Sequence, residues 1–227
     1  MMTTSNNDIP NFAGIGMTSA RTRERLVKRL RDNGISSPKI LDLVRMVPRH
    51  LFIDEALAHQ AYDDNALPIG HGQTISQPWV VARMTELLTE NGIPQKVLEV
   101  GTGCGYQTAF LAGLGCDVYS VERIRPLMEQ ARKRLMDLGL ARVQVKHADG
   151  GFGWAAQAPF DGILAACGRP DIPDDLLKQL ADGGRLVMPM GEEGQQRLTV
   201  VDRIGDEFKI RKLDPVRFVP FARGIVK

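Results

Sequence analysis

The stretch that decides the fold runs Val97-Leu98-Glu99-Val100-Gly101-Thr102-Gly103-Cys104-Gly105-Tyr106-Gln107-Thr108, an apolar run that breaks into three alternating glycines and then into helix-forming sequence. We interpret it as a strand, a ligand-binding loop and a helix. Glycines let the backbone take positive φ, and they carry no Cβ that would keep a ligand away from the main chain. The helix that follows turns its unpaired N–H groups and the positive end of its dipole toward the loop. The stretch therefore predicts a loop on which a cofactor can lie.

The spacing of these glycines indicates which cofactor it is. Dinucleotide-binding loops run G-x-G-x-x-G, but here Tyr106 stands at the third glycine position and Gly105 arrives one residue early, which argues against NAD. A second apolar run, 116–121, ends in Glu122, whose carboxylate can accept hydrogen bonds from two ribose hydroxyls. This pairing resembles the signature of class I S-adenosylmethionine-dependent methyltransferases. The alternative is an ordinary strand-to-helix turn followed by a surface glutamate.

Composition limits the other possibilities. A chain of 227 residues with 43% hydrophobic content can bury one sizeable core. Its formal net charge is only +2, and the sequence contains no basic stripe, so we do not expect a nucleic-acid partner. The three cysteines, Cys104, Cys116 and Cys167, have no metal-like spacing, and we expect buried, reduced thiols. With a polar N-terminus and no apolar window that could span a bilayer, we expect a cytoplasmic protein that does not bind a membrane. We also expect a monomer without a bound metal.

Strands and helices alternate along most of the chain. We expect residues 1–16 to form a flexible arm and 17–227 to form a single methyltransferase domain, with N-terminal helices and a substrate loop at 17–77 and the cofactor-binding core and C-terminal strands at 78–227. This alternation predicts an α/β fold: a doubly wound, mostly parallel, Rossmann-like sheet with an N-terminal helical layer and antiparallel C-terminal strands around Gly205.

The expected elements follow from hydrophobic periodicity and from stop signals. Helices are expected from Thr18 or Ser19 to Asn33, from Pro38 to Pro48, and at 78–91, 106–114, 124–138 and 173–181; strands are expected at 96–100, 117–121, 142–146, 160–165, 185–189, 197–204 and 208–213. Residues 61–78, rich in Gly, Pro and Asn, fit neither a strand nor a helix. A long ordered loop of this kind is more often functional than not.

Three blocks resemble the protein-L-isoaspartate O-methyltransferase family: Tyr62 to Pro78, Leu98 to Ala112, and Val216 to Phe221. The resemblance runs from roughly Leu26 to the C-terminus, and the block Thr74-Ile75-Ser76-Gln77-Pro78 carries most of it. It implies methylation of the abnormal α-carboxylate of isoaspartyl residues in damaged proteins and peptides, with S-adenosyl-L-methionine as donor and S-adenosylhomocysteine as by-product. The resulting ester closes to a succinimide, which begins repair.

The resemblance also implies a set of site residues. Ser76 is the catalytic residue; cofactor contacts come from Glu99, Gly101, Thr102, Gly103, Gly105, Tyr106, Gln107, Thr108, Glu122, Arg123, Asp149 and Gly150; substrate contacts come from Thr74, Ile75, Ser76, Gln77, Val216, Arg217, Phe218, Val219 and Pro220. The sequence departs from the usual family pattern at Cys104, Ala148 and Phe221, none of which has a chemical role.

The reaction requires the protein mainly to align the carboxylate with the methyl donor. A carboxyl group with an ordinary pKa of about 3.9 is already an anion at neutral pH, so its attack on a sulfonium methyl group needs no general base. A strong cation pressed on that carboxylate would lower its nucleophilicity, whereas the hydroxyl of Ser76 can orient it with one hydrogen bond. The alternative role for Ser76 is a plain helix cap, because serine is a preferred cap residue.

Other candidates have competing interpretations. Asp149 can accept a hydrogen bond from the adenine amino group or simply form an Asp-Gly turn. Arg217 can meet the substrate or be an exposed strand residue. We expect His59 and His71 to be structural and assign no partner to the other two histidines. Two rival functions stay open: a methyltransferase acting on another small molecule, a protein or a nucleic acid, and a non-catalytic nucleotide-binding module.

Overall fold

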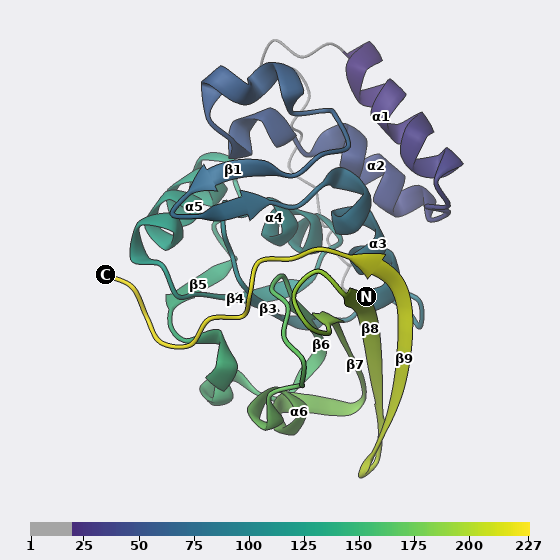
Figure 1. Ribbon diagram of the computed structural model, residues 1–227, viewed down its shortest axis with the longest axis vertical. Coiled ribbons are helices and arrows are strands. Elements are labelled where there is room, and N and C mark those ends of the chain that lie inside the picture. Colours follow the sequence, from purple (N-terminus) through teal and green to yellow (C-terminus); the bar gives the residue numbers. More distant parts are fainter. Residues whose placement is uncertain (1–19) are drawn as a thin grey trace, which may run out of the picture.

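A seven-stranded sheet forms the centre of the molecule (Figure 1). The computed structural model describes residues 20–227, so the expected arm at 1–16 and the expected cap at Thr18 or Ser19 lie outside the described residues. The strand order is β5-β4-β3-β6-β7-β8-β9, parallel from β5 to β7 and antiparallel for the last two pairs. The strands are β3 (Lys96–Val100), β4 (Asp117–Glu122), β5 (Gln144–His147), β6 (Phe160–Ala165), β7 (Leu180–Met190), β8 (Gln196–Ile204) and β9 (Glu207–Val216).

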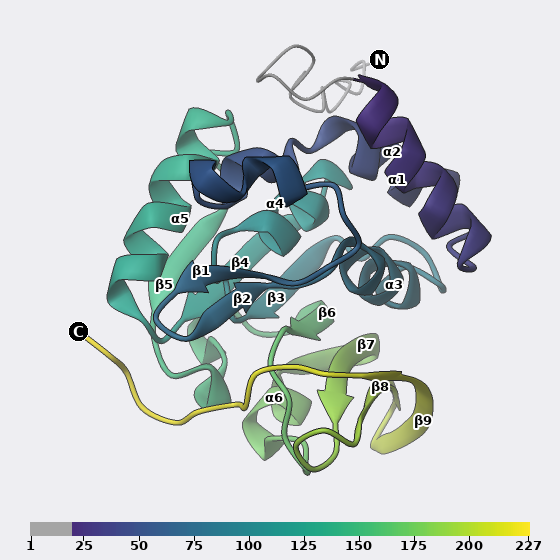
Figure 2. The same ribbon diagram turned by 45° about the horizontal axis from the view of Figure 1, so that its top comes forward.

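Helices cover both faces of this sheet (Figure 2). Neighbouring side chains of a strand point to opposite faces, so Val97 packs with the core beneath α3 and α4, whereas Leu98 packs with the core beneath α6. The helices are α1 (Ala20–Asp32), α2 (Pro38–Met46), α3 (Pro78–Leu88), α4 (Tyr106–Gly113), α5 (Arg125–Asp137) and α6 (Asp174–Gln179). The expected doubly wound, mostly parallel fold with antiparallel C-terminal strands is confirmed.

The strand order reverses beside β3. The chain runs outward from β3 through β4 to β5 and then returns to β6, on the opposite side of β3. In doubly wound sheets, ligands bind at such a reversal, outside the carboxyl ends of the strands. The loop that follows β3 is the glycine-rich segment 101–105, so the topology places it at this position.

The expected N-terminal helical layer is formed by α1 and α2. Gly34, with φ of 95°, follows α1, and the N–H of Ile35 turns back to the carbonyl of Leu30 at 3.0 Å. This is the expected glycine stop. One carboxylate oxygen of Glu86, on α3, then accepts the backbone N–H groups of Ser36 and Ser37 at 2.8 Å each, which ties the layer to the core.

Residues 61–78 correct one expectation, because they contain regular structure. β1 (Leu67–Gly70) and β2 (Gln73–Ile75) form an antiparallel hairpin. Its two turn residues, His71 and Gly72, have φ of 53° and 67°, the conformation that tight hairpin turns require. Strands this short carry too few alternating positions to give a readable period. Two 3₁₀ helices precede the hairpin, η1 (Arg49–Phe52) and η2 (Glu55–Gln60).

The other differences concern element ends. The expected helix at 173–181 stops at Gln179, and β7 begins at Leu180 rather than Arg185, passing through a register irregularity opposite Phe160 and Gly162. β9 continues through Pro215 to Val216, as an edge strand permits. Two more 3₁₀ helices, η3 (Gly150–Phe152) and η4 (Ala155–Gln157), lead into β6. Within residues 20–227, no helix is long and apolar enough to cross a membrane, and no group of three or more His, Cys, Asp or Glu residues is placed to hold a metal.

Candidate active site

The glycine loop has the conformation that the sequence predicts. Gly101, Gly103 and Gly105 have φ of 93°, 54° and 91°. The N–H of Gly101 donates to the carbonyl of Val121 at 2.9 Å, and that of Gly105 donates to the carbonyl of Thr102 at 2.8 Å, so the loop folds tightly over the end of the sheet. Gly105 occupies the N-cap position of α4, where no side chain caps the helix. The first N–H groups of α4 therefore remain available to a ligand.

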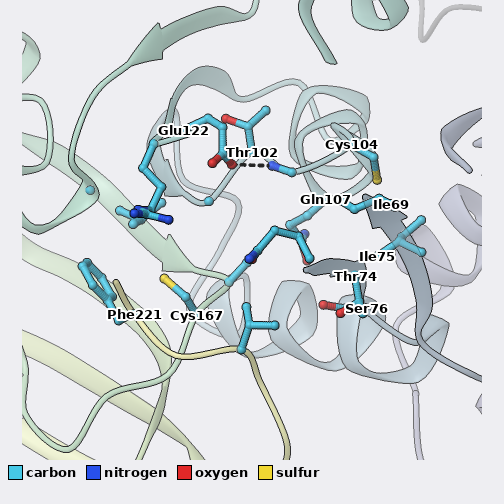
Figure 3. A pocket seen from close by; sticks show the side chains of 18 of the residues that line it. Ile69, Thr74, Ile75, Ser76, Thr102, Cys104, Gln107, Glu122, Cys167 and Phe221 are labelled. Carbon is cyan, nitrogen blue, oxygen red and sulfur yellow. Dashed lines mark hydrogen bonds between the residues drawn. The ribbon is translucent and has the colours of Figure 1, made fainter. Parts of the chain in front are cut away.

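Glu122 ends β4 and reaches the glycine loop. Its carboxylate accepts the N–H of Gly103 through Oε2 at 2.9 Å (Figure 3). It also accepts the N–H of Ile124 through Oε1 at 2.9 Å. The side chain is buried, yet it lines the cavity beside the loop. Each carboxylate oxygen can accept more than one hydrogen bond. Glu122 therefore fixes the loop and still offers acceptors to a ligand.

Glu99 lies beneath the loop rather than in the cavity. Its Oε2 accepts the hydroxyls of Thr108 and Ser120 at 2.6 Å each, whereas its buried Oε1 has no hydrogen-bond partner among the described residues. The hydroxyl of Ser120 also bonds that of Thr102 at 2.5 Å. Complete burial raises the pKa of Glu99 to about 7. These hydroxyls link Glu99 to the loop that holds the ligand.

A cavity extends from the loop to the hairpin β1–β2 on one side and to the C-terminal segment on the other (Figure 3). Its lining includes these expected cofactor residues: Gly101, Thr102, Gly103, Tyr106, Gln107, Glu122, Arg123 and Gly150. It does not include Glu99, Gly105, Thr108 or Asp149. The lining also holds residues that the sequence analysis did not single out, among them Ile69, Gln73, Val81, Ala166, Cys167 and Ala222. We name it the cofactor cavity.

Asp149 makes the hydrogen bonds of a turn. Its Oδ1 accepts the N–H of Gly151 at 2.8 Å, and its Oδ2 accepts the N–H of Gly224 at 2.5 Å. The same C-terminal segment receives Arg123, whose Nε donates to the carbonyl of Gly224 at 3.0 Å. The segment thus runs along the edge where the parallel strands end (Figure 1). The adenine contact of Asp149 stays a prediction.

A second cavity opens beside the first, between the start of α3, the start of β8 and the residues that follow β9. We name it the peptide groove; its lining comprises Ala66, Thr74, Ser76, Gln77, Trp79, Val80, Ala166, Gly194, Gln195, Gln196, Arg197, Pro215, Val216, Arg217, Phe218 and Val219. Every expected substrate residue lines this groove or the cofactor cavity. Four residues line both: Thr74, Ser76, Ala166 and Val219. The two cavities therefore meet at Ser76.

Ser76 does not cap α3. The N-cap residue is Gln77, which makes no side-chain cap bond, and the N–H of Trp79 is satisfied by Oδ1 of Asp64 at 2.8 Å. The interpretation of Ser76 as a plain cap is therefore wrong. Its half-buried side chain makes no hydrogen bond to any other residue in the described part of the chain, and it faces the cavity beside Thr74 (Figure 3). The hydroxyl is free to donate to a ligand.

Gln196 fixes one wall of the peptide groove. Its buried carboxamide accepts the N–H of Phe218 at 2.6 Å and donates to the carbonyl of Phe218 at 3.4 Å. A Cβ on Gly168 would lie 2.3 Å from Nε2 of Gln196, so only glycine leaves room for this clamp. Gly168 in turn bonds Val219 and Phe221 through its N–H and carbonyl, at 3.0 and 2.8 Å.

Only some of the lining residues that were not predicted have a signal in the sequence. Ala166 and Cys167 directly follow β6, the neighbour of β3, so a parallel strand order predicts them at the site. Nothing in the pattern singles out Gln195, Gln196 or Arg197. Cys104 and Cys116 are buried as expected, whereas Cys167 is only partly buried; Cys104 and Cys167 both line the cofactor cavity.

The histidines lie outside both cavities. His50 bonds the hydroxyl of Tyr62 at 3.0 Å, His59 bonds Gln60 at 3.1 Å, and His147 contacts the carbonyl of Arg123 at 3.0 Å. His71 forms the hairpin turn described above. The expectation that His59 and His71 are structural agrees with these positions.

A Rossmann-like sheet, a G-x-G-x-G loop at its reversal point and an acid ending the next strand together define a class I methyltransferase. The model of the protein-L-isoaspartate(D-aspartate) O-methyltransferase family matches residues 21–225, so the chain belongs to that family. It is 73% identical over 216 residues to a protein-L-isoaspartate O-methyltransferase of Alcanivorax borkumensis, covering 95% of this chain and 98% of that one. It is 56% identical to protein-L-isoaspartate O-methyltransferase 1 of Marinobacter nauticus, covering 94% and 97% of the two chains. A solved protein-L-isoaspartate O-methyltransferase structure superposes with a TM-score of 0.79 at 26% identity, covering 87% of this chain and 65% of that one.

Proposed function

We propose that this chain transfers a methyl group from S-adenosyl-L-methionine to the free α-carboxylate of L-isoaspartyl residues in damaged proteins and peptides. One observation carries the proposal: a cavity built on the glycine loop meets an open groove at the free hydroxyl of Ser76. A donor in the first and a peptide in the second would meet at that point. The family to which the chain belongs carries this activity in its name.

The cofactor cavity has groups that suit a nucleoside with a charged amino acid tail. Glu122 has acceptor capacity left for ribose hydroxyls, and the start of α4, where no side chain caps the helix, can meet a carboxylate. Gly150 also lines the cavity. A Cβ on Gly150 would lie 2.3 Å from Cγ1 of Val100, so this position accommodates only glycine. S-adenosyl-L-methionine, when bound, supplies a methyl group on a sulfonium centre.

The protein's task in this reaction is alignment. The isoaspartyl carboxylate is an anion at neutral pH and needs no base. Ser76 would donate one hydrogen bond to it and orient the second oxygen toward the methyl donor, a neutral contact that leaves the oxygen nucleophilic. Thr74 and Val219, which also border both cavities, would confine the peptide around that carboxylate. Transfer of the methyl group leaves S-adenosylhomocysteine. The neighbouring backbone nitrogen then attacks the ester carbonyl and expels methanol, and the resulting succinimide begins repair.

We propose that residues 17–227 work as one methyltransferase domain. We further propose a cytoplasmic monomer that uses neither nucleic acid nor a membrane. The free thiols of Cys104, Cys116 and Cys167 suit a reducing compartment, and the net charge of +2 gives little attraction for nucleic acid.

The decisive experiment compares an isoaspartyl peptide with its ordinary aspartyl twin, using S-adenosyl-L-methionine labelled in the methyl group. We expect label transfer to the isoaspartyl peptide only, as an ester that releases labelled methanol at mildly alkaline pH when it closes to the succinimide. Equal labelling of both peptides, or labelling of neither, would refute the proposed function. A small-molecule or nucleic-acid substrate would then have to be sought by the same label.

Replacing Glu122 by Gln tests the cofactor assignment. The amide keeps the shape but removes the charge and one acceptor, so either Gly103 or Ile124 loses its partner. We expect the Kd for S-adenosyl-L-methionine to rise about five- to tenfold, the equivalent of about 1–1.4 kcal/mol. Calorimetry measures this Kd, with NAD as the ligand that should not bind. An unchanged affinity would remove Glu122 from the cofactor site.

A further inference from the structure

The peptide groove carries two arginines that no carboxylate of the described chain pairs with. Arg197 and Arg217 both line it, both side chains are exposed, and neither makes an ion pair or a hydrogen bond with another of residues 20–227. No carboxylate is among the described residues that line the groove. Two guanidinium groups therefore give the groove a positive charge, although the chain as a whole is nearly neutral.

The sheet register places these two arginines at the same end of the β8–β9 ladder. Arg197 lies opposite Pro215, and Gln196 lies opposite Val216, the residue before Arg217. Asp214, the acidic residue closest in sequence to Arg217, is already paired with Arg83 at 2.9 Å. Glu192 and Glu193 lie in the preceding exposed turn and do not line the groove. The positive charge is thus left for a ligand.

We propose that the peptide groove selects isoaspartyl sites that have Asp or Glu side chains close by in the peptide sequence. This inference rests on the proposed function and names its preferred substrate class. A guanidinium group binds a carboxylate through two parallel hydrogen bonds, which makes arginine a selective partner for acidic side chains. The groove's other polar lining groups, such as Thr74, Gln77 and Gln195, carry no charge that would oppose this.

The two arginines act on binding and not on the methyl transfer. Neither lines the cofactor cavity, whereas Ser76 lines both cavities. The reacting carboxylate therefore meets a neutral hydroxyl, and the cations meet the neighbouring side chains. The preference should appear in KM and leave kcat nearly constant. Because exposed charges are screened by salt, it should also shrink as ionic strength rises.

The test uses three isoaspartyl peptides of one sequence, whose flanking positions carry Glu, Gln or Lys. For the native enzyme we expect KM to increase from Glu to Gln to Lys, by about two- to fivefold at each step, the range that exposed ion pairs give. Arg197→Gln and Arg217→Gln should each reduce the spread, and the double variant should abolish it. Arg132→Gln is the matched control, because Arg132 is an exposed residue of α5 that lines neither the groove nor the cofactor cavity.

Four results would overturn the inference: equal KM values for the three peptides, a preference that survives in the double variant, the same loss of preference in Arg132→Gln, or a preference that resides in kcat and not in KM. All of these presuppose that isoaspartyl peptides are methylated and their aspartyl twins are not. Failure of that comparison would refute the proposed function itself, so the two failures are distinguishable.

Discussion

Ser76→Ala should lower kcat/KM for an isoaspartyl peptide by about fivefold to 150-fold, the loss that corresponds to one hydrogen bond to a charged group, about 1–3 kcal/mol. The reason is its position: its hydroxyl lies where the cofactor cavity and the peptide groove meet, without another protein partner in the described structure. Cofactor affinity should barely change. Steady-state methylation and calorimetry on the same preparation measure both quantities.

Two further variants separate alignment from stability. Ser76→Thr retains the hydroxyl and should recover part of the activity. Asp64→Ala removes the actual partner of the Trp79 N–H, so this variant, rather than Ser76→Ala, should lose about 1 kcal/mol of stability. A Ser76→Ala enzyme that melts at a lower temperature but retains full specific activity would show that its role is structural.

Glu99 should make the protein less stable as the pH rises toward neutrality. Its pKa is about 7 in the folded protein against an ordinary 4.5, so between these values the folded state binds more protons than the unfolded state. The free energy of unfolding should therefore fall by up to about 3 kcal/mol as the pH rises through this window. Above the window Glu99 is ionised in both states and causes no further change. The cause is burial of a carboxylate whose Oε1 has no hydrogen-bond partner within residues 20–227.

The measurement is the unfolding free energy from urea titrations at pH 5 and pH 8. Glu99→Gln cannot ionise, so its stability should change less between the two pH values than that of the native protein. Glu129→Gln serves as the control, because Glu129 is an exposed carboxylate on α5 and should retain the native pH profile. If the Glu99→Gln and native profiles coincide, Glu99 does not titrate in this window.

The elements that the sequence predicted are those whose signals are local and strong. A buried parallel strand followed by Gly101, Gly103 and Gly105 allows few other conformations, and an acid ending the next strand must lie beside that loop once the strands are parallel. The hairpin of β1 and β2 was missed because strands of four and three residues show no period. The true start of β7 was missed because Gly183 and Gly184 interrupt its apolar run.

The residues of the candidate site also differ in whether they have a local sequence signal. Ser76 and Glu122 stand within contiguous motifs and could be predicted, whereas Gln196 is recognisable only when the register brings β8 against the residues after β9. Arg197 carries no sequence signal of its own, because one exposed arginine in a strand is common. Its relevance depends on Arg217 sharing the groove and on Asp214 being occupied by Arg83.

The clamp of Gly168, Gln196 and Phe218 has a consequence for how the molecule loses function. It joins the residues after β6, the start of β8 and the residues after β9, at the antiparallel end of the sheet where β9 is the edge strand. The glycine loop and Glu122, by contrast, follow or end β3 and β4, two paired strands inside the sheet. The edges of a structure open before its central strands. A molecule with an opened edge would thus lose the wall against which a damaged peptide is held, together with the part of the cofactor cavity formed by residues 219–222, while the glycine loop and Glu122 stayed in place. Such a molecule would retain half of the methyl-donor site and perform no repair.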